Sequence, residues 1–545
     1  MKKYIFTTIL SVFFAHQSGA QVLSHKENFT KQDTLRGSNT EFRNWWDVKH
    51  YDLSIEPDYD TRFIKGVNKI EFSAEKNRTS DVLQIDLQEP MKITSVLLNG
   101  VKVNEYERDG NVYFLTIGKL VKEKKNILEI AFEGKPRVAV RPPWDGGWIF
   151  AKDNEGRPWM SVAVQGLGAS AWFPNKDYQG DEPDNGADLE IIVPKGLVGI
   201  GNGRKVSAKE VGDKVAYKWR VVNPINNYNI IPYIGYYQNF KDEFKGSDGK
   251  LDLDYYVLDY NLDKAKKQFD QNKKMLACFE DWFGPYPFYK DSFKMIESPH
   301  LGMEHQSGIA YGNQFMNGYL GNDLSGTGYG LKWDFIIIHE SGHEWFGNNI
   351  TAKDVADMWV HESFTSYSET LYTECQQGKK AADLYNIGNR QNIQNDIPIV
   401  GPYGVNQEGS GDMYSKGANM LHTFRTWLND DVKFKNILRG LNKDFYHQTV
   451  TGEQVEIYLA KKSGLDLTSF FNQYLRSTKI PTLEMKLNNQ TLSYRYTNIV
   501  DGFNMPLRLE NNQTILPTKD WQVFDGKLKD FKVLPTYYIF YNELM

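Results

Sequence analysis

The sequence predicts an α+β protein of several domains. The chain has 545 residues, enough for about three or four domains that each bury a core. Apolar and polar residues alternate between residues 45 and 255, apolar residues follow helical spacing between 256 and 480, and alternation returns between 481 and 545. We therefore expect an N-terminal β-domain, a mostly helical central domain and a small C-terminal β-domain.

Residues 1–20 predict a secretory signal peptide. Lysines at positions 2 and 3 precede a short apolar run over residues 4–15, and small residues at 18–20 come before the expected cleavage site at Gln21. The apolar run is shorter than the ~20 residues that a membrane-spanning helix needs. We expect an exported protein, periplasmic or extracellular, with no stable membrane insertion once the signal is removed.

The mature chain is expected to begin with a loose polar leader over residues 21–44, which has no periodicity. Alternating runs such as residues 51–55 and 128–132 then mark short strands. Turn signals, Asn99-Gly100 among them, fall between such runs and support a β-rich domain.

The central region begins with YNLDKAKKQFDQNKKMLACFEDWFG, which has helical spacing and stops at Gly284-Pro285. Cys278 and Cys375 are the only cysteines, and both lie in segments that read as helical. Two cysteines in so long a chain do not make a disulfide framework, and we expect buried free thiols. A zinc site built from thiolates is excluded.

The charge of the chain argues against nucleic acid as a partner. There are 64 basic and 69 acidic residues, which leaves a net charge of −5. A protein whose main activity is binding a nucleic-acid backbone carries a clear basic excess.

The segment IIIHESGHEWFGNN contains the pattern H-E-x-x-H. Residues four apart lie on one face of a helix, so His339 and His343 can reach the same metal ion. Glu340 lies about 100° further round the axis, close enough to contact a metal-bound water without binding the metal. The pattern also arises by coincidence, so the metal site needs a third ligand and further catalytic groups.

The third ligand is predicted to be Glu362. The metzincin pattern H-E-x-x-H-x-x-G-x-x-H fails, because Phe346 and Asn349 stand where Gly and His are required. Glu362 lies on the next helix, in MWVHESFTSYSETLY, among apolar residues that argue against an exposed acid. Glu369, two turns later, either orients a ligand from behind or is an exposed helix residue.

The spacing from His343 to Glu362, with eighteen residues between them, resembles the zinc aminopeptidases related to aminopeptidase N and leukotriene hydrolase. The local text W-V-H-E-S-F departs from the commoner W-x-N-E-G-F at His361 and Ser363. The resemblance implies one Zn²⁺ per chain, bound by His339, His343 and Glu362, in a short, secreted bacterial type of the family.

Two upstream segments extend the resemblance. Gly302, Met303 and Glu304, followed by His305 in place of Asn, match the family's G-x-M-E-N motif, whose Glu binds the free amino group of the substrate. The segment SVAVQGLGASAWFPNKD places Gln165 at the family's second amine-binding position, where its amide oxygen would accept from an ammonium group. Outside the family, Glu304 reads as a strand-end acid paired with a lysine and Gln165 as a surface residue.

Downstream, GDMYSKGANMLHTF matches the family's Y-x-K-G signature, so the resemblance gives Tyr414 the role of hydrogen-bonding the oxyanion. The implied activity is hydrolysis of the N-terminal residue from peptides, with Glu340 as general base toward a metal-activated water. The implied fold is an N-terminal β saddle, a thermolysin-like catalytic domain and a small β-domain. Only about 65 residues follow Ile480, so we expect no large helical C-terminal domain and a more open site.

Three other functions stay open at this stage. An endopeptidase on the same site is the nearest, and it differs in whether Glu304 enforces a free amino terminus. An inactive peptide-binding protein is disfavoured because both histidines, Glu340, Glu362 and Tyr414 are all present. An epoxide hydrolase needs a lipid tunnel against a further helical domain. The sequence gives neither the side-chain preference at the first substrate residue nor the oligomeric state.

Overall fold

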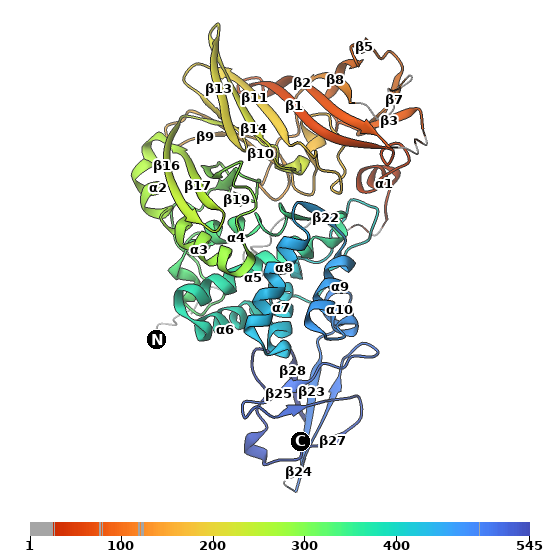
Figure 1. Ribbon diagram of the computed structural model, residues 1–545, viewed down its shortest axis with the longest axis vertical. Coiled ribbons are helices and arrows are strands. Elements are labelled where there is room, and N and C mark those ends of the chain that lie inside the picture. Colours follow the sequence, from red (N-terminus) through yellow and green to blue (C-terminus); the bar gives the residue numbers. More distant parts are fainter. Residues whose placement is uncertain are drawn as a thin grey trace, which may run out of the picture.

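The computed structural model describes residues 26–544 except 27, 76, 77, 79, 118, 119, 121–124 and 490. The predicted signal peptide over residues 1–20 lies outside the described residues. Twisted β-sheets form one end of the elongated molecule, helices form the middle, and a small β unit forms the other end (Figure 1). Within the described part of the chain, no helix is long and apolar enough to span a membrane.

An eight-stranded sheet dominates the N-terminal region, in the order β13-β14-β11-β1-β2-β8-β4-β5. In its long strand β1, Tyr51, Leu53 and Ile55 are buried while the residues between them are half-buried. Alternate side chains of a strand point to opposite faces, so one face of this sheet covers a core. Its strands are β1 (Trp46–Asp58), β2 (Phe63–Ala74), β4 (Lys92–Leu98), β5 (Val101–Lys102), β8 (Asn126–Gly134), β11 (Ala187–Pro194), β13 (Arg204–Val211) and β14 (Lys214–Val221).

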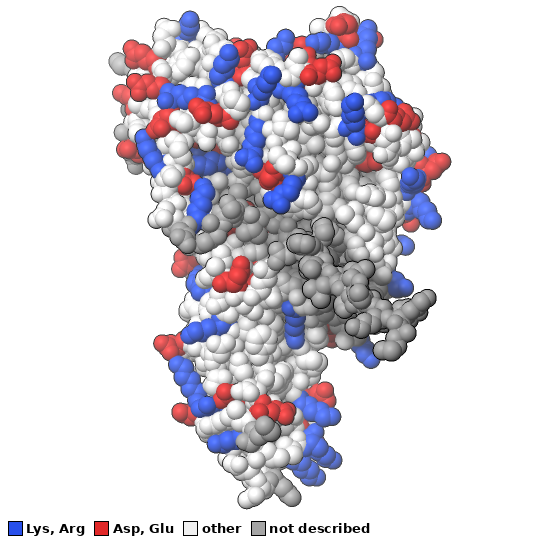
Figure 2. Space-filling view, turned by 180° about the vertical axis from the view of Figure 1, so that it is seen from behind, with Lys and Arg blue, Asp and Glu red and all other residues white. Residues whose placement is uncertain are grey.

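Two smaller sheets complete this region and enclose the same core. One has the order β3-β7-β6, with β3 (Val82–Asp86), β6 (Tyr106–Asp109) and β7 (Val112–Thr116). The other has the order β12-β15-β10-β9, with β9 (Gly147–Lys152), β10 (Pro158–Ala163), β12 (Val198–Ile200) and β15 (Tyr233–Gly235). On the surface seen from behind, basic and acidic side chains are interspersed rather than gathered by sign (Figure 2).

The expected loose leader is wrong for its described part. Helix α1 (Lys31–Gly37) begins with a capping box between Thr30 and Asp33. Arg43 is completely buried, with Nη1 3.1 Å from Asp86 Oδ2 and Nη2 donating to Leu35 O at 2.7 Å. The segment lacks periodicity because paired polar groups, rather than an apolar stripe, hold it against the β-domain.

A five-stranded sheet separates two hydrophobic cores. Its order is β16-β17-β18-β20-β19, with β16 (Tyr237–Gly246), β17 (Gly249–Leu258), β18 (Phe293–Glu297), β19 (Gly302–Met303) and β20 (Ile309–Tyr311). In β17, Leu253 and Tyr255 pack in the helical core, whereas Tyr256 and Leu258 pack in the N-terminal core. The domain boundary predicted at residue 256 therefore falls within a strand that both cores share, and the exact domain limits stay a prediction.

Helices cover the other face of this sheet and pack around α5. Residues 359–373 of α5 are all buried, so the helix is enclosed along most of its length. It packs against α3, α4, α6 and α7. The helices are α2 (Leu262–Gln268), α3 (Gln271–Phe283), α4 (Phe335–Gly342), α5 (Trp359–Gln377), α6 (Lys379–Gly388), α7 (Ser415–Leu428), α8 (Asp431–Asp444), α9 (Gly452–Ser463) and α10 (Thr468–Leu475).

Two further β units complete the structure. A short pair joins β21 (Ile350–Ala352) to β22 (Gln448–Val450). The C-terminal unit has a sheet in the order β27-β24-β23-β28 and a β25-β26 pair. Its strands are β23 (Thr482–Asn488), β24 (Thr491–Thr497), β25 (Leu507–Arg508), β26 (Thr514–Ile515), β27 (Gln522–Val523) and β28 (Phe540–Leu544).

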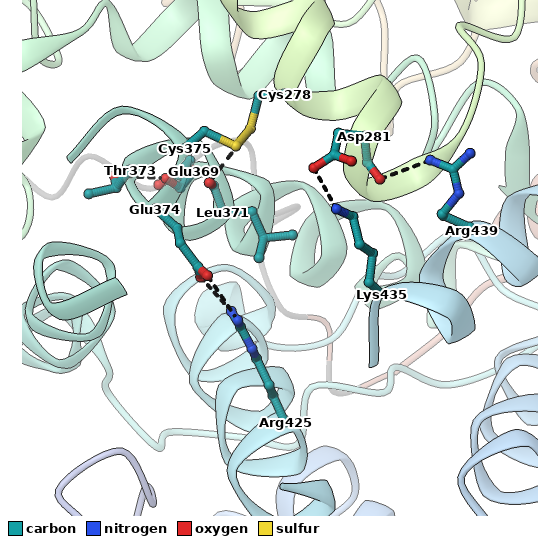
Figure 3. Close-up of a disulfide and its surroundings, with 10 residues drawn as sticks. All are labelled: Cys278, Asp281, Glu369, Leu371, Thr373, Glu374, Cys375, Arg425, Lys435 and Arg439. Atoms are coloured by element: carbon teal, nitrogen blue, oxygen red, sulfur yellow. Dashed lines mark hydrogen bonds and ion pairs between the residues drawn. A yellow bond between two sulfur atoms is a disulfide. The ribbon is translucent and has the colours of Figure 1, made fainter. Parts of the chain in front are cut away.

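A disulfide joins Cys278 of α3 to Cys375 near the end of α5 (Figure 3). The expectation of free thiols is therefore wrong. The two cysteines are 97 residues apart in sequence, but helix packing brings their Cα atoms to 6.1 Å, within the range that a disulfide spans. Beside it, Glu374 pairs with Arg425 of α7 at 2.6 Å, so two cross-links hold this end of α5 (Figure 3).

We expect loss of the disulfide to destabilise the helical region. Because the bridge closes a long loop, the Cys278→Ser, Cys375→Ser double variant should lose about 2–5 kcal/mol of unfolding free energy. Thermal or denaturant unfolding of the variant and the wild type measures this loss. Adding reductant should lower the stability of the wild type and leave that of the variant unchanged. Equal stabilities without reductant would contradict the expectation.

Candidate metal centre

Helix α4 presents the two histidines to one point. Asp334 caps its N-terminus, with Oδ1 accepting from Ile336 N at 3.1 Å and Ile337 N at 3.3 Å. His339 and His343 follow one turn apart, with ring centroids at 5.0 Å. Both rings are buried, so the helix delivers two imidazoles to the same buried position.

Glu362 completes the set from the first turn of α5. Its Oε2 lies 3.7 Å from His339 Nε2 and 3.4 Å from His343 Nε2, and one ligand atom from each residue lies within 4.8 Å of the others. This oxygen is buried and has no hydrogen-bond partner among the described residues. Two histidines and one carboxylate match the donor set of a catalytic zinc site, and the unpartnered Oε2 of that carboxylate is available to bind the metal.

The Nδ1 atom of each histidine, on the side away from the metal position, contacts an oxygen atom. Glu369 Oε1 lies 2.7 Å from His339 Nδ1, and Tyr385 donates its hydroxyl to the other Glu369 oxygen at 2.7 Å. His343 Nδ1 lies 3.0 Å from the carbonyl oxygen of Phe346. These contacts fix each ring with Nε2 toward the metal position, the usual arrangement behind metal-binding histidines.

Charge in the site is concentrated in buried carboxylates. Burial would raise the pKa of Glu362, but His343 and His339 outweigh it and lower this pKa below its ordinary range. Burial raises the pKa of Glu340 to about 7, although the same histidines oppose the rise. A carboxylate with a pKa near 7 is suited to proton transfer at neutral pH.

Gly302 allows strand β19 to approach α4 closely. A Cβ at Gly302 would lie 2.7 Å from Glu340 Oε1 and 2.9 Å from the side chain of Ile336. The glycine therefore provides the room that Glu340 occupies. Met303, the next residue, is buried and also faces the site.

Glu304 lies close to Glu340, and two side chains donate hydrogen bonds to its carboxylate. Gln165 Nε2 donates to Glu304 Oε1 at 2.6 Å and to Glu362 Oε1 at 3.4 Å. The hydroxyl of Tyr228 also donates to Glu304 Oε1, at 2.9 Å. Burial raises the pKa of Glu304. The structure thus brings Glu304 and Gln165 together, with the amide nitrogen of Gln165 engaged and its oxygen left as an acceptor.

Sequence reasoning missed two residues that contact Glu304. Tyr228 had no usable signal, since it is one of 32 tyrosines and lies in no recognised motif. Asn348 donates Nδ2 to the main-chain oxygen of Glu304 at 2.7 Å. Its place five residues after His343 was a signal that the sequence offered.

Tyr414 approaches the metal position from the start of α7. Its ring stacks on that of His339, with centroids 6.0 Å apart and planes at 29°. Ser363 Oγ donates to the carbonyl oxygen of Met413 at 2.8 Å, which ties the residue before Tyr414 to α5. A Cβ at Gly417 would lie 2.0 Å from Ser363 Oγ, so the glycine provides the room that Ser363 occupies.

The two histidines that depart from the family pattern have structural contacts. His361 Nε2 accepts from Ala352 N at 2.8 Å, and burial lowers its pKa to about 3. His305 Nδ1 lies 2.6 Å from the hydroxyl of Tyr233, and burial lowers its pKa as well. Burial thus favours the neutral form of both rings, and neither residue is among those that line the metal position.

Nine of the ten predicted site residues line one cleft, and Glu369 lies behind it. The cleft has a volume of about 90 Å³. We name it the catalytic cleft, and it is lined by Pro143, Trp144, Gln165, Leu301, Gly302, Met303, Glu304, Tyr319, Leu324, Phe335, Ile336, His339, Glu340, His343, Glu362 and Tyr414.

Residues 267–474 match the family model described as "Peptidase family M1 domain". This segment of the chain is an M1 peptidase domain. His339, His343 and Glu362 form the zinc site of this M1 domain, with one ion per chain. The predicted cofactor, one zinc ion per chain, is thereby confirmed.

Curated relatives at low sequence identity accompany this match. "Probable aminopeptidase 2" of Sulfurisphaera tokodaii is 23% identical over 91% of this chain, and "Leucyl aminopeptidase" of Saccharolobus solfataricus is 22% identical over 89%. The chain spans 64% and 62% of the lengths of these two relatives.

Solved M1 structures share the fold. The M1 zinc metallopeptidase of Deinococcus radiodurans, as a mutant bound to a Tyr-Ser-Ala substrate, superposes with a TM-score of 0.68 at 18% identity. The match covers 81% of this chain and 96% of that one. The predicted fold class, with N-terminal β-sheets, a helical zinc-binding region and a small C-terminal sheet, is confirmed.

We expect Glu369 to set zinc affinity. The Glu369→Gln variant should bind zinc about 10- to 100-fold more weakly, because a neutral amide replaces the charged acceptor that orients His339. Tyr385→Phe, which removes only one hydrogen bond to Glu369, should have a smaller effect in the same direction. Competition with a chelator of known affinity measures both. Wild-type zinc affinity in Glu369→Gln would show that the contact has no role in metal binding.

Proposed function

We propose that the protein is a zinc aminopeptidase that removes the first residue from peptides with a free N-terminus. The observation that carries this proposal is the position of Glu304. One oxygen of Glu304, one of Glu340 and one nitrogen of His343 lie within 4.8 Å of one another. A buried carboxylate so close to the proton-transfer group selects a substrate whose ammonium group lies one residue from the reacting carbonyl.

The second amine contact supports the same register. Gln165, already bonded to Glu304 through its amide nitrogen, keeps its amide oxygen as an acceptor for an ammonium hydrogen. Burial of Glu304 raises the cost of leaving it unpaired, and a substrate ammonium group compensates for that cost. The names of the relatives from Sulfurisphaera tokodaii and Saccharolobus solfataricus also support an aminopeptidase.

The remaining residues divide the chemistry. When bound, zinc supplies a Lewis acid that polarises the scissile carbonyl and increases the acidity of a water molecule. Glu340 accepts the proton of the attacking water and delivers it to the leaving amine. The hydroxyl of Tyr414 donates a hydrogen bond to the carbonyl oxygen as it gains negative charge. Glu369 keeps His339 in the orientation that the metal needs.

We further propose that the protein is exported to the periplasm or the extracellular medium. Residues 1–20 have the composition of a secretory signal. The bond between Cys278 and Cys375 supports this location, because disulfides persist in oxidising compartments and are rare in the cytosol.

The proposed activity is tested with one peptide in two forms, with a free N-terminus and with an acetylated one. The zinc-loaded protein should release the first residue from the free form only, and a chelator should stop the release. Cleavage of both forms would instead indicate an endopeptidase. No cleavage of either form, across several first residues, would indicate a peptide-binding protein without catalysis.

We expect Glu340→Gln to separate metal binding from turnover. The substitution keeps the shape of the side chain but removes its proton acceptor, so kcat should fall by about 10²- to 10⁴-fold. Zinc content, measured by elemental analysis, should match that of the wild type. Glu453→Gln, at an exposed glutamate of α9, is the matched control and should retain full activity. Peptide cleavage by Glu340→Gln at the wild-type rate would exclude Glu340 as the base.

A further inference from the structure

A second hollow continues from the catalytic cleft. It lies where β17, β18 and β20 end, has a volume of about 580 Å³, and shares Trp144 and Leu301 with the catalytic cleft. We name it the downstream groove. Among the residues that line it are Trp144, Trp159, Tyr260, Lys264, His300 and Leu301.

The direction of a bound peptide follows from two fixed points, given the proposed function. The amino group of the peptide lies at Glu304, and the reacting carbonyl lies near Glu340. Glu340 in turn lies next to Gly302, where a Cβ would contact its carboxylate. The first residue therefore runs from Glu304 back toward Gly302, opposite to the chain direction of β19. The second and third residues then lie beside Leu301 and His300, at the entrance of the downstream groove.

The volumes agree with this path. The catalytic cleft, at about 90 Å³, is too small for more than the reacting part of a peptide, whereas the downstream groove has about 580 Å³. In the described part of the chain, β19 is also an edge strand of its sheet. An extended peptide pairs readily with such an edge.

His300 offers the groove an unused polar group. Its side chain is 4% exposed, and neither ring nitrogen has a hydrogen-bond partner among the described residues. Burial lowers its pKa to about 4, against an opposing contact with the main chain of Gly302, so the ring is neutral and carries one donor and one acceptor. A peptide backbone passing this point presents the matching groups, N–H and C=O.

Lys264 supplies a positive charge on the rim of the groove. Its hydrogen bond is a long one, from Nζ to Asn261 Oδ1 at 3.4 Å, and it forms no ion pair within 4 Å among the described residues. The nearby carboxylate of Glu297 accepts from Leu258 N at 2.8 Å and from Asn261 Nδ2 at 2.7 Å, and the charge of Lys264 acts to lower its pKa against the larger effect of burial. The side chain of Lys264 is exposed, so it can contact an incoming anion.

We propose that the downstream groove binds the residues after the scissile bond and that Lys264 pairs with the C-terminal carboxylate of a short peptide. The substrate class is then tripeptides and tetrapeptides with a free C-terminus. This inference rests on the proposed aminopeptidase function and narrows its substrates by length and by charge at the far end.

The test compares a tripeptide and a tetrapeptide, each as the free acid and as the C-terminal amide, with one first residue that the protein accepts. For one of these lengths, the full zinc-loaded protein should have a kcat/KM about 2- to 5-fold higher for the free acid than for the amide, the size of effect that an exposed ion pair gives. The difference should lie in KM rather than in kcat. In Lys264→Met the acid and amide should be equal, and in Lys264→Glu the amide should be the better substrate. Lys266→Met, on the opposite side of α2, is the matched control and should keep the wild-type preference.

An aminoacyl 4-nitroanilide with the same first residue separates this inference from the proposed function. It has no C-terminal carboxylate, so all three variants should hydrolyse it at the wild-type rate. Failure of the wild type on the anilide and the peptides alike would overturn the proposed function and the inference with it. Anilide hydrolysis without any acid preference, or with a preference that Lys264→Met retains, would overturn the inference alone.

Discussion

Charge balance in the catalytic cleft is the constraint on which the rest of the structure depends. Glu304, Glu340 and Glu362 are buried within a few ångströms of His339 and His343. Three carboxylates in a site of low dielectric constant repel one another unless cations compensate. A zinc ion carries two positive charges, and the substrate ammonium group of the proposed function carries a third. Without a cation, the folded protein therefore has an electrostatic cost at this site, which bound zinc relieves.

Helix α5 carries this arrangement. Near its start Glu362 faces the two imidazoles, and Ser363 ties the Tyr414 segment to the same turn. Two turns later Glu369 supports His339 from behind. The far end is fixed by the disulfide and by the pair of Glu374 with Arg425. A shift of α5 along its axis would therefore displace both the metal ligand Glu362 and Glu369, the residue that orients His339.

Local spacing explains which parts of the site the sequence predicts. His339, His343 and Glu340 lie on one helix, so their relation depends only on helical geometry. Glu362 requires a helix that returns beside α4, and its apolar neighbours in sequence indicated that burial. Gln165 could be placed only through the resemblance to a family, because it comes from a separate β-hairpin region far from the helices in sequence.

Other features depend on neighbours that no local pattern encodes. Tyr228 reaches Glu304 from a short turn of the N-terminal region, and nothing in its own segment marks it. The cysteines pair because α3 and α5 pack together, which their separate helical patterns do not reveal. The N-terminal segment is ordered by Arg43 inside a set of polar partners, and a reading based on apolar periodicity cannot detect such a contact.

The alternation of β17 between two cores has a consequence for how the molecule can be divided. β16 and β17 precede residues 267–474, the segment that matches the family model, yet they form the far side of the sheet whose other edge is β19. A fragment cut to that segment would lose the strand that pairs with β18 and would expose the face of the remaining sheet that packs in the N-terminal core. The helical region and the β-rich region thus share one sheet, and the recognisable family segment contains only part of it.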